Sequence, residues 1–432
     1  MQTRFSDAQL QDPGIAEAND ILRKCVHCGF CTATCPTYVT LGDELDSPRG
    51  RIYLIKEMLE GGNPATEATV RHLDRCLTCL SCTTTCPSGV DYMHLLDHGR
   101  RHIEETWQRP LTDRWLRALL KWLLPKPALF RLALVGAKLA RPFAPLFPGR
   151  LSAMLKMSSA SISSPSPVDQ PGIHNADGKR QMRVAMLSGC AQQVVGGDIN
   201  EATIRLLRRH GVEVVIAYGM GCCGALTQHM GDEAAAQKSA RANIAAWLTV
   251  KENGGLDAIV VNASGCGTTV KDYGHLLKGD ADWADKAAEI SDLTVDISEL
   301  MIKVGLQNVN LPAEAATLGV AYHAACSLQH GQKVVSPPKD LLRQAGFTIR
   351  DVGEGHLCCG SAGTYNLLQP EIADQLGQRK AGNIKATGAD IVAAGNIGCM
   401  VQISAHSGLP VVHSVELLDW ATGGPRPASL DR

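Results

Sequence analysis

The sequence lacks the features that mark a secreted, membrane-spanning or nucleic-acid-binding chain. Its formal net charge is −1 over 432 residues, so no whole-molecule field favours a nucleic acid partner. The N-terminus has no basic start followed by an apolar run, which predicts no secretory signal. No apolar run of about 18 residues occurs, since lysine, arginine and proline interrupt the most apolar stretch, 116–150. We therefore expect a cytoplasmic chain without a transmembrane helix.

Signals for a bound nucleotide are also weak. No phosphate-binding loop of the form G-x-x-x-x-G-K-[ST] occurs, and no G-x-G-x-x-G run is expected to follow a strand. Nothing else in the sequence indicates a flavin. The chain is therefore expected to bind neither flavin nor nucleotide.

Sixteen cysteines are the most informative residues. Because the cytosol keeps thiols reduced, this number in a chain without a secretory signal favours metal binding over disulfides. Eight of them form two words, CVHCGFCTATCP at 25–36 and CLTCLSCTTTCP at 76–87. Each word has the spacing C-x2-C-x2-C-x3-C-P, in which the fourth cysteine binds the cluster of the other word. We predict two [4Fe–4S] clusters, the first held by Cys25, Cys28, Cys31 and Cys86, and the second held by Cys35, Cys76, Cys79 and Cys82.

Zinc and histidine ligation are the weaker alternatives for these words. Zinc sites prefer two C-x2-C pairs, whereas each word has four cysteines and a proline. His27 is interpreted as a surface or supporting residue. Between the words, Ser47 and Pro48 are typical of a helix start, and an apolar stripe follows over 52–59. Residues 1–105 are therefore predicted to form a helical ferredoxin domain, similar to the module in iron–sulfur subunits of respiratory dehydrogenases.

The other eight cysteines form a second, larger repeat. Each half has one cysteine, then C-C-G beginning 32 residues later, then one late cysteine; the eight are Cys190, Cys222, Cys223, Cys266, Cys326, Cys358, Cys359 and Cys399. The runs MRVAMLSGC and LGVAYHAAC pair between the halves, as do LDAIVVNASGC and ADIVAAGNIGC. Strands alternating with helices predict two α/β domains with parallel sheets and with cysteines at the C-terminal ends of strands. The fold class is thus α+β multidomain, with the two sites facing each other across a pseudo-twofold axis.

Adjacent thiols followed by glycine are better explained by a metal or a closely approaching ligand than by a disulfide, which would strain the ring. Small buried core residues are the alternative. These eight cysteines are candidate redox or acceptor sites, and no catalytic residue is assigned.

The combination of the ferredoxin words with two C-C-G halves resembles the cysteine-rich-domain family. That family includes heterodisulfide reductase subunits, the third subunit of anaerobic glycerol-3-phosphate dehydrogenase and lactate-utilisation proteins. Four stretches, RKCVHCGFCTATCPTYVTLGDELDSPRGRIYLIK, HLDRCLTCLSCTTTCPSGV, NASGCGTTVKDYG and HLCCGSAGTYNLLQP, carry a closer likeness to the iron–sulfur subunits of bacterial glycolate oxidases. The resemblance covers essentially the whole chain.

This resemblance implies a subunit that passes electrons from flavin-containing 2-hydroxy acid oxidase partners, two of them, towards a quinone. Clusters carry single electrons, so oxidation of glycolate to glyoxylate is expected on the flavin subunit. D-lactate or glycerol 3-phosphate are alternative donors. A heterodisulfide-reductase-like thiol/disulfide reductase, with the C-C-G cysteines as its active site, is an alternative of another class.

The chain departs from the fuller members of the family at the end of each half. Those members end each half with C-x2-C, but the positions three residues from the late cysteines are Ala263, Thr269, Asn396 and Gln402. Ala324 stands where some relatives carry a further cysteine. Each half therefore offers at most four thiols. An additional cluster in one half is left open, and so is a redox-silent site.

Residues 107–150 hold half of the tryptophans and nine Lys/Arg beside one acid between Arg109 and Arg150. Basic residues beside tryptophan and leucine in broken helices favour a segment lying on an anionic membrane, on the cytoplasmic face of the inner membrane. A helical linker packed on a partner subunit is the alternative. The expected domains are 1–105 (ferredoxin), 106–155 (basic aromatic helices), 156–181 (flexible linker), 182–310 (first C-C-G half) and 311–432 (second C-C-G half).

Several polar residues near the C-C-G cysteines could donate to a quinone or carry protons. They are His229, His323, His330, His356, Lys271, Asp272 and Tyr273. A structural or supporting role is expected for each, and none is singled out.

Overall fold

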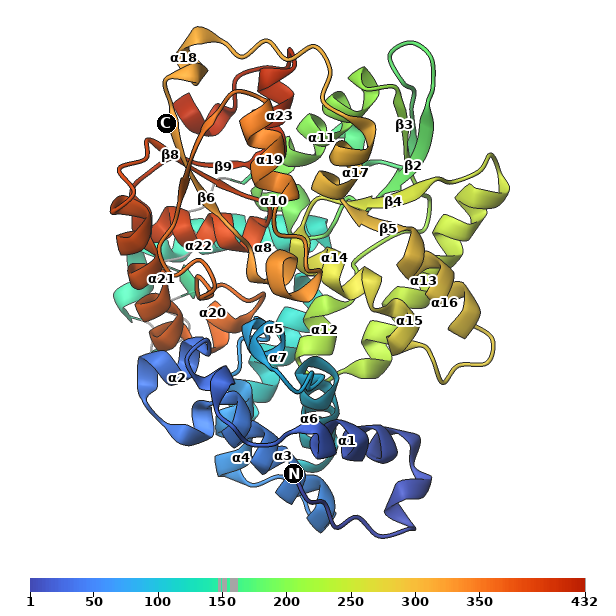
Figure 1. Cartoon of the computed structure of the whole chain (residues 1–432), viewed down its shortest axis with the longest axis vertical. Coiled ribbons are helices and arrows are strands. Elements are labelled where there is room, and N and C mark those ends of the chain that lie inside the picture. Colours follow the sequence, from blue (N-terminus) through green and yellow to red (C-terminus); the bar gives the residue numbers. More distant parts are fainter. Residues whose placement is uncertain (147–148, 150–153, 156–161, 432) are drawn as a thin grey trace.

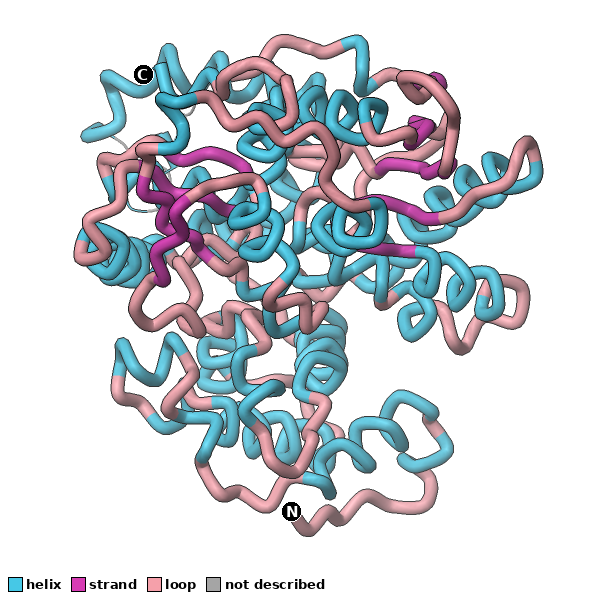
Figure 2. Tube along the Cα trace, turned by 45° about the horizontal axis from the view of Figure 1, so that its top comes forward, coloured by secondary structure: helices cyan, strands magenta, loops and turns pink. Residues whose placement is uncertain are grey.

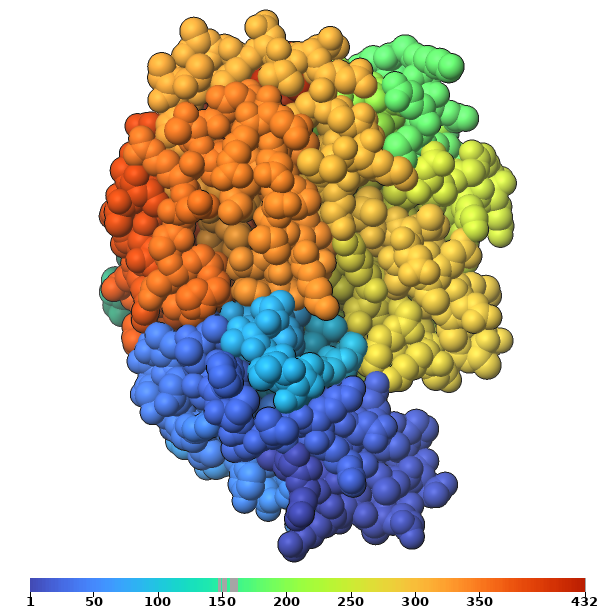
Figure 3. Space-filling model, viewed as in Figure 1, coloured from blue at the N-terminus to red at the C-terminus, as the bar shows by residue number. Residues whose placement is uncertain are grey.

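The computed structural model describes residues 1–432 except 147–148, 150–153, 156–161 and 432. Its N-terminal module lies at one end of the molecule, below two α/β halves that stand side by side (Figure 1). The space-filling view shows the module in contact with both halves (Figure 3). Residues 156–161 of the expected linker lie outside the described part of the chain.

The N-terminal module is helical. Its helices are α1 (Pro13–Lys24), α2 (Pro36–Leu41), α3 (Pro48–Gly61), α4 (Glu67–Asp74), α5 (Ser81–Thr85) and α6 (Tyr92–Thr106). Helix α3 starts where the sequence predicts, because the Ser47 side chain accepts a hydrogen bond from Gly50 N at 3.0 Å and Pro48 occupies the first turn. Ile52, Ile55 and Leu59 bury its inner face in a core shared with α1 and α6. This packing folds the long spacer so that the two cysteine words lie side by side.

Two further helices, α7 (Leu111–Leu123) and α8 (Pro127–Ala140), and the turn η4 (Arg141–Leu146) connect the module to the halves. Within the described ranges, we find no helix long and apolar enough to cross a membrane.

The first half is built on a five-stranded sheet with the order β1-β3-β2-β4-β5. Its strands are β1 (Gly172–His174), β2 (Met182–Met186), β3 (Val212–Ile216), β4 (Ala258–Val261) and β5 (Thr294–Asp296). Its helices are α10 (Gln192–Val195), α11 (Gly197–Arg209), α12 (Ala225–His229), α13 (Glu233–Glu252), α14 (Ser264–Lys271), α15 (Tyr273–Leu276), α16 (Ala284–Leu293) and α17 (Ile297–Val304). All pairings are parallel except β1 with β3. Residues 172–174, expected within a flexible linker, are therefore an edge strand.

The second half has a four-stranded parallel sheet with the order β7-β6-β8-β9, the order of the first half without β1. Its strands are β6 (Gly319–His323), β7 (Thr348–Asp351), β8 (Ile391–Ala394) and β9 (Val411–His413). Its helices are α18 (Ala313–Ala316), the π-turn η6 (Ser327–Gly331), α19 (Pro337–Gln344), α20 (Tyr365–Leu368), α21 (Pro370–Lys385), α22 (Ile397–Ser407) and α23 (Ser414–Ala421). Figure 2 shows the two groups of strands as separate sheets.

The two halves share one hydrophobic core between their sheets. Helix α11 packs on α23, and α17 packs on α19. Because α11 corresponds to α19 and α17 to α23 in the repeat, exchanging the halves converts one contact into the other. This reciprocity is what a pseudo-twofold axis requires. The opposite faces of the sheets are covered by α13 and α16 in one half and by α21 and α22 in the other.

Candidate metal centres

The cysteines of the two words line two adjoining cavities. Cys25, Cys28, Cys31 and Cys86 line the first, together with Cys82. Cys35, Cys76, Cys79 and Cys82 line the second. Each cavity therefore combines three cysteines of one word with the last cysteine of the other, and Cys82 lies on the boundary between them.

These thiols lie in surroundings that disfavour their free ionised form. Burial raises the pKa of Cys31 to about 11 and the pKa of Cys79 and Cys82 well above the usual thiol value. Since a thiolate is the metal-binding form, buried cysteines of this kind become good ligands only beside a cation. None of the sixteen cysteines forms a disulfide. The eight cysteines of the two words are therefore available as thiolate ligands, and this set of donors fits iron–sulfur clusters in the module.

One buried cation stands beside the second cavity. The side chains of Arg51 and Asp46 are 1% and 0% exposed and are joined at 3.3 Å. Arg51 Nη1 also donates to Cys35 Sγ at 3.7 Å. Burial opposes the charge of Arg51, but the anionic forms of Cys76 and its neighbours outweigh burial and hold the pKa of the guanidinium above its usual range. Arg51 was not among the site residues predicted from the sequence. An arginine next to the apolar stripe of a helix was the available signal for such a buried charge.

In the first half the cysteines follow strands β2, β3 and β4, as predicted. Cys190 Sγ lies 3.6 Å from Cys222 Sγ, and Gly224 N donates to Cys222 Sγ at 3.5 Å. Cys223 contacts both Cys222 and Cys266, so the four thiols form one cluster. The hydroxyl of Tyr273 donates to Cys223 O at 2.8 Å. This hydrogen bond of Tyr273 stabilises the turn that contains Cys223.

The turn before Cys222 corrects one sequence expectation. Gly219, Gly221 and Gly224 have the spacing G-x-G-x-x-G and follow β3. The helix that follows, α12, is only five residues long, and cysteines fill the two positions before the last glycine. The run is thus a cysteine-bearing turn that shares the spacing of a dinucleotide loop.

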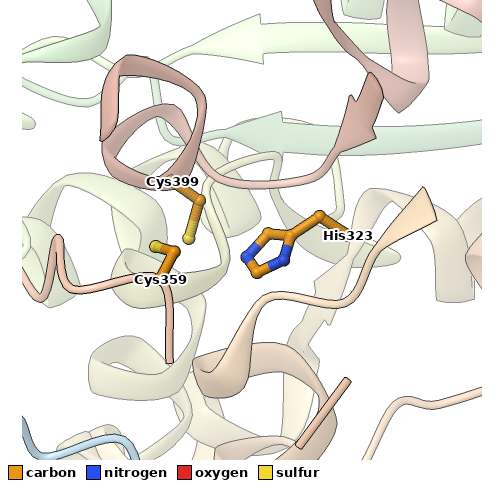
Figure 4. Close-up of side chains that lie close together, drawn as sticks. All are labelled: His323, Cys359 and Cys399. Atoms are coloured by element: carbon orange, nitrogen blue, oxygen red, sulfur yellow. The ribbon is translucent and has the colours of Figure 1, made fainter. Parts of the chain in front are cut away.

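The second half repeats this cluster with one addition. Cys326 Sγ lies 3.7 Å from Cys358 Sγ, and Cys359 contacts both Cys358 and Cys399. His323, the last residue of β6, offers a ring nitrogen within 4.8 Å of the sulfurs of Cys359 and Cys399, and all three residues are buried. Figure 4 shows the imidazole pointing toward the two sulfurs. Burial and then the charge of Lys380 lower the pKa of His323 to about 3.

Several of the other polar candidates contact residues of neighbouring parts of the fold. His330 Nδ1 contacts Thr84 Oγ1 at 2.7 Å, and its Nε2 lies 3.3 Å from His356 O, which ties the second half to the second word. Asp272 accepts from His94 of α6 at 3.0 Å. Burial and then the charge of Arg100 lower the pKa of His229 to about 4, with no cysteine beside it among the described contacts. Lys271 pairs with Glu299.

The second half lies directly against the second cavity. Cys79 and Cys358 belong to one buried cluster with Leu77, Tyr365 and Ile372 of the two domains, and Cys326 packs at its edge. Burial is the largest cause of the raised pKa of Cys79, and the negative charge of an ionised Cys326 is the second largest. The second word and the cysteines of the second half therefore share one buried cluster.

The first half meets the module elsewhere, through α12, α13 and α15: Gln228 Nε2 donates to Asp97 at 3.1 Å, and Glu233 pairs with Arg101 at 3.0 Å. The rings of His94 and His275 are stacked with centroids 3.4 Å apart. Glu17 of α1 contacts His275 at 2.9 Å. This contact surface contains no cysteine among its described members.

Helices α7 and α8 expose apolar side chains. We call the following residues the α7–α8 face, all of them exposed: Leu111, Trp115, Leu119, Trp122, Leu132, Val135, Leu139, Phe143 and Leu146. The expected basic face is smaller than the sequence indicated, because Arg109, Arg117 and Lys121 turn inward to pair with Asp74, Asp113, Glu104 and Asp232. Arg114, Lys126, Lys138 and Arg141 remain exposed.

Comparison with protein families assigns domains to the same regions. Residues 21–90 match the model of a 4Fe–4S dicluster domain, and residues 184–271 and 320–404 each match the model of the CCG cysteine-rich domain. The chain therefore carries iron–sulfur clusters in its N-terminal module.

Among curated proteins, the chain is 43% identical over 421 residues to the glycolate oxidase iron–sulfur subunit of Escherichia coli K12, covering 98% of this chain and 99% of that protein. It is 32% identical to a probable glycolate oxidase iron–sulfur subunit of Bacillus subtilis 168, covering 93% and 94% of the two chains. Lactate utilization protein A of Bacillus licheniformis is 27% identical over 55% of this chain. A crystal structure of a hypothetical protein from Helicobacter pylori matches 97% of this chain and 74% of that chain with a TM-score of 0.57 and 10% identity, which supports the fold alone.

Proposed function

Because this chain belongs to the family of glycolate oxidase iron–sulfur subunits, we propose that it is the electron-transfer subunit of a complex that oxidises glycolate or a related 2-hydroxy acid. The observation that carries this proposal is the full-length 43% identity to such a subunit, combined with eight cysteines around two adjoining cavities. A [4Fe–4S] cluster supplies one-electron transfer, so the substrate has to be oxidised on a partner with two-electron chemistry.

The ligand sets we propose are crossed: Cys25, Cys28, Cys31 and Cys86 for one cluster, and Cys35, Cys76, Cys79 and Cys82 for the other. The lining of the two cavities supports this assignment. The test compares three serine variants by low-temperature EPR of the reduced chain. With crossed ligands, Cys35→Ser removes the same signal as Cys79→Ser. If Cys35→Ser instead removes the signal lost in Cys28→Ser, each word binds its own cluster.

The partners we propose are flavin-containing 2-hydroxy acid oxidase subunits, two of them, with a quinone as the acceptor. The tagged chain should co-purify with a flavoprotein, and the assembled complex should reduce a quinone analogue when glycolate is added. D-lactate or glycerol 3-phosphate as the preferred donor would keep the electron-transfer role and change the substrate. A complex without flavin would contradict the partner proposal.

Relay through the second half is supported by the buried cluster that contains both Cys79 and Cys358. Cys358→Ser should slow quinone reduction by the assembled complex, whereas Cys222→Ser in the first half serves as the matched control. Unchanged quinone reduction in Cys358→Ser would exclude this route. Disulfide reduction by the chain alone, with a supplied electron donor, would favour the alternative thiol/disulfide reductase.

We also propose that the α7–α8 face lies on the cytoplasmic surface of a membrane rich in anionic lipid. An exposed apolar surface of this kind marks an interaction site. The residues Leu111, Trp115, Leu119 and Trp122 follow the i, i+4, i+8, i+11 spacing of a single helical stripe. Its exposed charges are basic, and Asp113, the only acid in 109–150, contacts Arg117 at 2.9 Å. Basic charges beside an apolar stripe match the interface of an anionic bilayer.

Vesicle flotation tests this placement with the purified full chain. Wild type should float with vesicles of phosphatidylglycerol and phosphatidylcholine and should bind phosphatidylcholine alone more weakly. Trp115→Glu combined with Leu119→Glu should lower binding about tenfold or more, whereas the control Tyr218→Glu, at an 89% exposed residue of the first half, should not. Loss of the flavin partner with unchanged flotation would identify the face as a subunit interface instead.

A further inference from the structure

A cavity of about 750 Å³ lies between the two halves. The segment 163–167 and the start of α11 form one wall, and α22 with the loop 408–410 after it forms the other. Its described lining contains no residue of the ferredoxin module, so it is separate from the two cysteine-lined cavities. Its volume lies in the range of about 300–1,000 Å³ that holds small-molecule ligands.

The wall that α22 provides is apolar and adjoins the cysteines of the second half. Ile397, Met400 and Val401 line the cavity. Met400 also packs against the buried core that contains Cys359 and Cys399. One side chain therefore borders both the cavity and the cysteine cluster. An apolar ring held against this wall lies close to the end of the relay proposed for the second half.

Two polar groups on the cavity are suited to a ligand with carbonyl oxygens. Ser429, in the turn η7 (Ala428–Asp431), has a buried hydroxyl with no hydrogen-bond partner among the described residues. Glu416 is 8% exposed, and its Oε2 accepts from His413 N at 2.8 Å, which fixes the carboxyl at the start of α23. An unpaired hydroxyl and a protonated carboxyl are both hydrogen-bond donors.

The carboxyl of Glu416 holds a proton near neutral pH. Burial raises the pKa of Glu416 to about 7, although the hydrogen bond from His413 N opposes the rise. The other charged groups that act on it are Asp198, Arg205 and Asp419. A carboxyl that titrates close to neutral pH can both donate a proton to a ligand and recover one from solvent.

The remaining acids on the cavity are less suited to this role. Glu201 accepts a hydrogen bond from Ser166 Oγ at 2.6 Å, and Asp198 is exposed to solvent.

The cavity also lies next to the α7–α8 face. Arg131 of α8 donates from Nε to the carbonyl oxygen of Ser163, which lines the cavity, at 2.9 Å. Its Nη2 donates to Gln193 O at 3.0 Å. Leu132 and Val135 of the same helix are exposed and belong to that face. The cavity is therefore close to the surface proposed to contact the membrane, where apolar electron acceptors dissolve.

We propose that this cavity binds the quinone acceptor, with the ring against Ile397 and Met400, one carbonyl oxygen facing Glu416 and the other facing Ser429. This assignment rests on the proposed function, which supplies the electrons. The quinone takes up two electrons, one at a time through the second half, and two protons, and it leaves as the quinol. Glu416 donates one proton to a quinone oxygen, and solvent supplies the other and reprotonates Glu416.

An azido derivative of a short-tail ubiquinone tests the site on the full chain. After illumination, mass spectrometry should find the label within 163–167 or 397–411, and excess unlabelled quinone should reduce this labelling. Label confined to the ferredoxin module, or label that excess quinone does not displace, would overturn the inference.

Ser404→Trp introduces a large ring into the cavity from an exposed position on α22, where it should not disturb folding. In the assembled complex with glycolate, quinone reduction relative to reduction of a soluble one-electron dye should fall about tenfold or more. Thr249→Trp, at an exposed position on α13 outside the cavity, is the matched control and should keep the wild-type ratio.

An unchanged ratio in Ser404→Trp would exclude the cavity as the quinone site. Absence of glycolate-driven dye reduction in wild type would instead overturn the proposed function, and the azidoquinone label would still decide where quinone binds.

Glu416→Gln keeps an oxygen that can accept from His413 N and removes the acidic proton. Quinone reduction by wild type should decline as pH rises through about 7, because the carboxyl loses its proton. At about pH 6, Glu416→Gln should be about tenfold or more slower, and it should lack this decline. Glu371→Gln, at an exposed acid of α21, is the control and should keep the wild-type profile. A wild-type profile in Glu416→Gln would leave this residue only its capping role.

Discussion

Replacing Arg51 by methionine should lower the reduction potential of the cluster proposed at Cys35. Arg51 is a buried cation that donates to Cys35 Sγ at 3.7 Å. Reduction adds negative charge beside this cation, so removing the cation makes reduction less favourable. Asp46 still has partners in the variant, because Arg75 contacts it at 2.8 Å and His72 at 2.9 Å.

The size of the shift follows from Coulomb's law. At 3.7 Å and an effective dielectric constant of about 20, the interaction of two unit charges is about 4.5 kcal/mol. For one electron this corresponds to about 190 mV. The added electron is shared over the whole cluster, and the charge of Asp46 offsets part of the field. We therefore expect a quarter to a half of this value, a fall of about 50–100 mV.

A redox titration followed by EPR measures the potentials of both clusters in wild type and Arg51→Met. Arg71→Met is the matched control, since Arg71 is exposed and lines neither cavity, so solvent should hold its effect below about 20 mV. The iron content must be unchanged in both variants. A fully loaded Arg51→Met chain whose two potentials equal those of wild type would refute the reasoning.

Two further predictions concern the N-terminal module. Burial opposes the charge of His94, but Asp272 and Asp91 outweigh it and raise the pKa of His94 to about 10, so its stabilisation is complete below about pH 6.5 and is lost as pH rises toward 10. Between pH 7 and 9 the free energy of unfolding should fall by up to about 1.4 kcal/mol per pH unit. The melting temperature should therefore decrease over this range, and His94→Gln should reduce the decrease. Gly50→Ala should destabilise the module by about 1–3 kcal/mol in thermal unfolding, because a Cβ would lie 2.1 Å from Glu44 O; a wild-type melting curve would show that this turn can yield.

The sequence was most informative where function depends on local spacing. The two cysteine words identify their cofactor because three of the ligands lie within seven consecutive residues. The start of α3 at Pro48 follows from the capping residue Ser47 alone. The C-C-G repeat predicted the parallel sheets and the placement of cysteines after strands, since strand ends in such sheets converge.

Features that depend on tertiary direction were harder to predict. Composition counts the charges of Arg109, Arg117 and Lys121. It does not show that they turn toward Asp74 and Asp232, which come from other parts of the fold. His323 was one of four histidines near cysteines, and only the folding of β6 and β8 into one sheet brings it to Cys399. The sequence does contain one signal for His323. The equivalent position of the first half is the apolar Leu187, and a polar residue at an apolar repeat position indicates a local role.

The two halves contact the ferredoxin module in different ways. Both halves present cysteines at equivalent strand ends, but the second places Cys358 in one buried cluster with Cys79, whereas the first meets the module through the stacked rings of His94 and His275. Because a single axis relates the halves, they cannot both place their cysteines against one cavity of an asymmetric module. The second half therefore brings its cysteines to the second cavity, whereas the first half contacts the module through polar side chains.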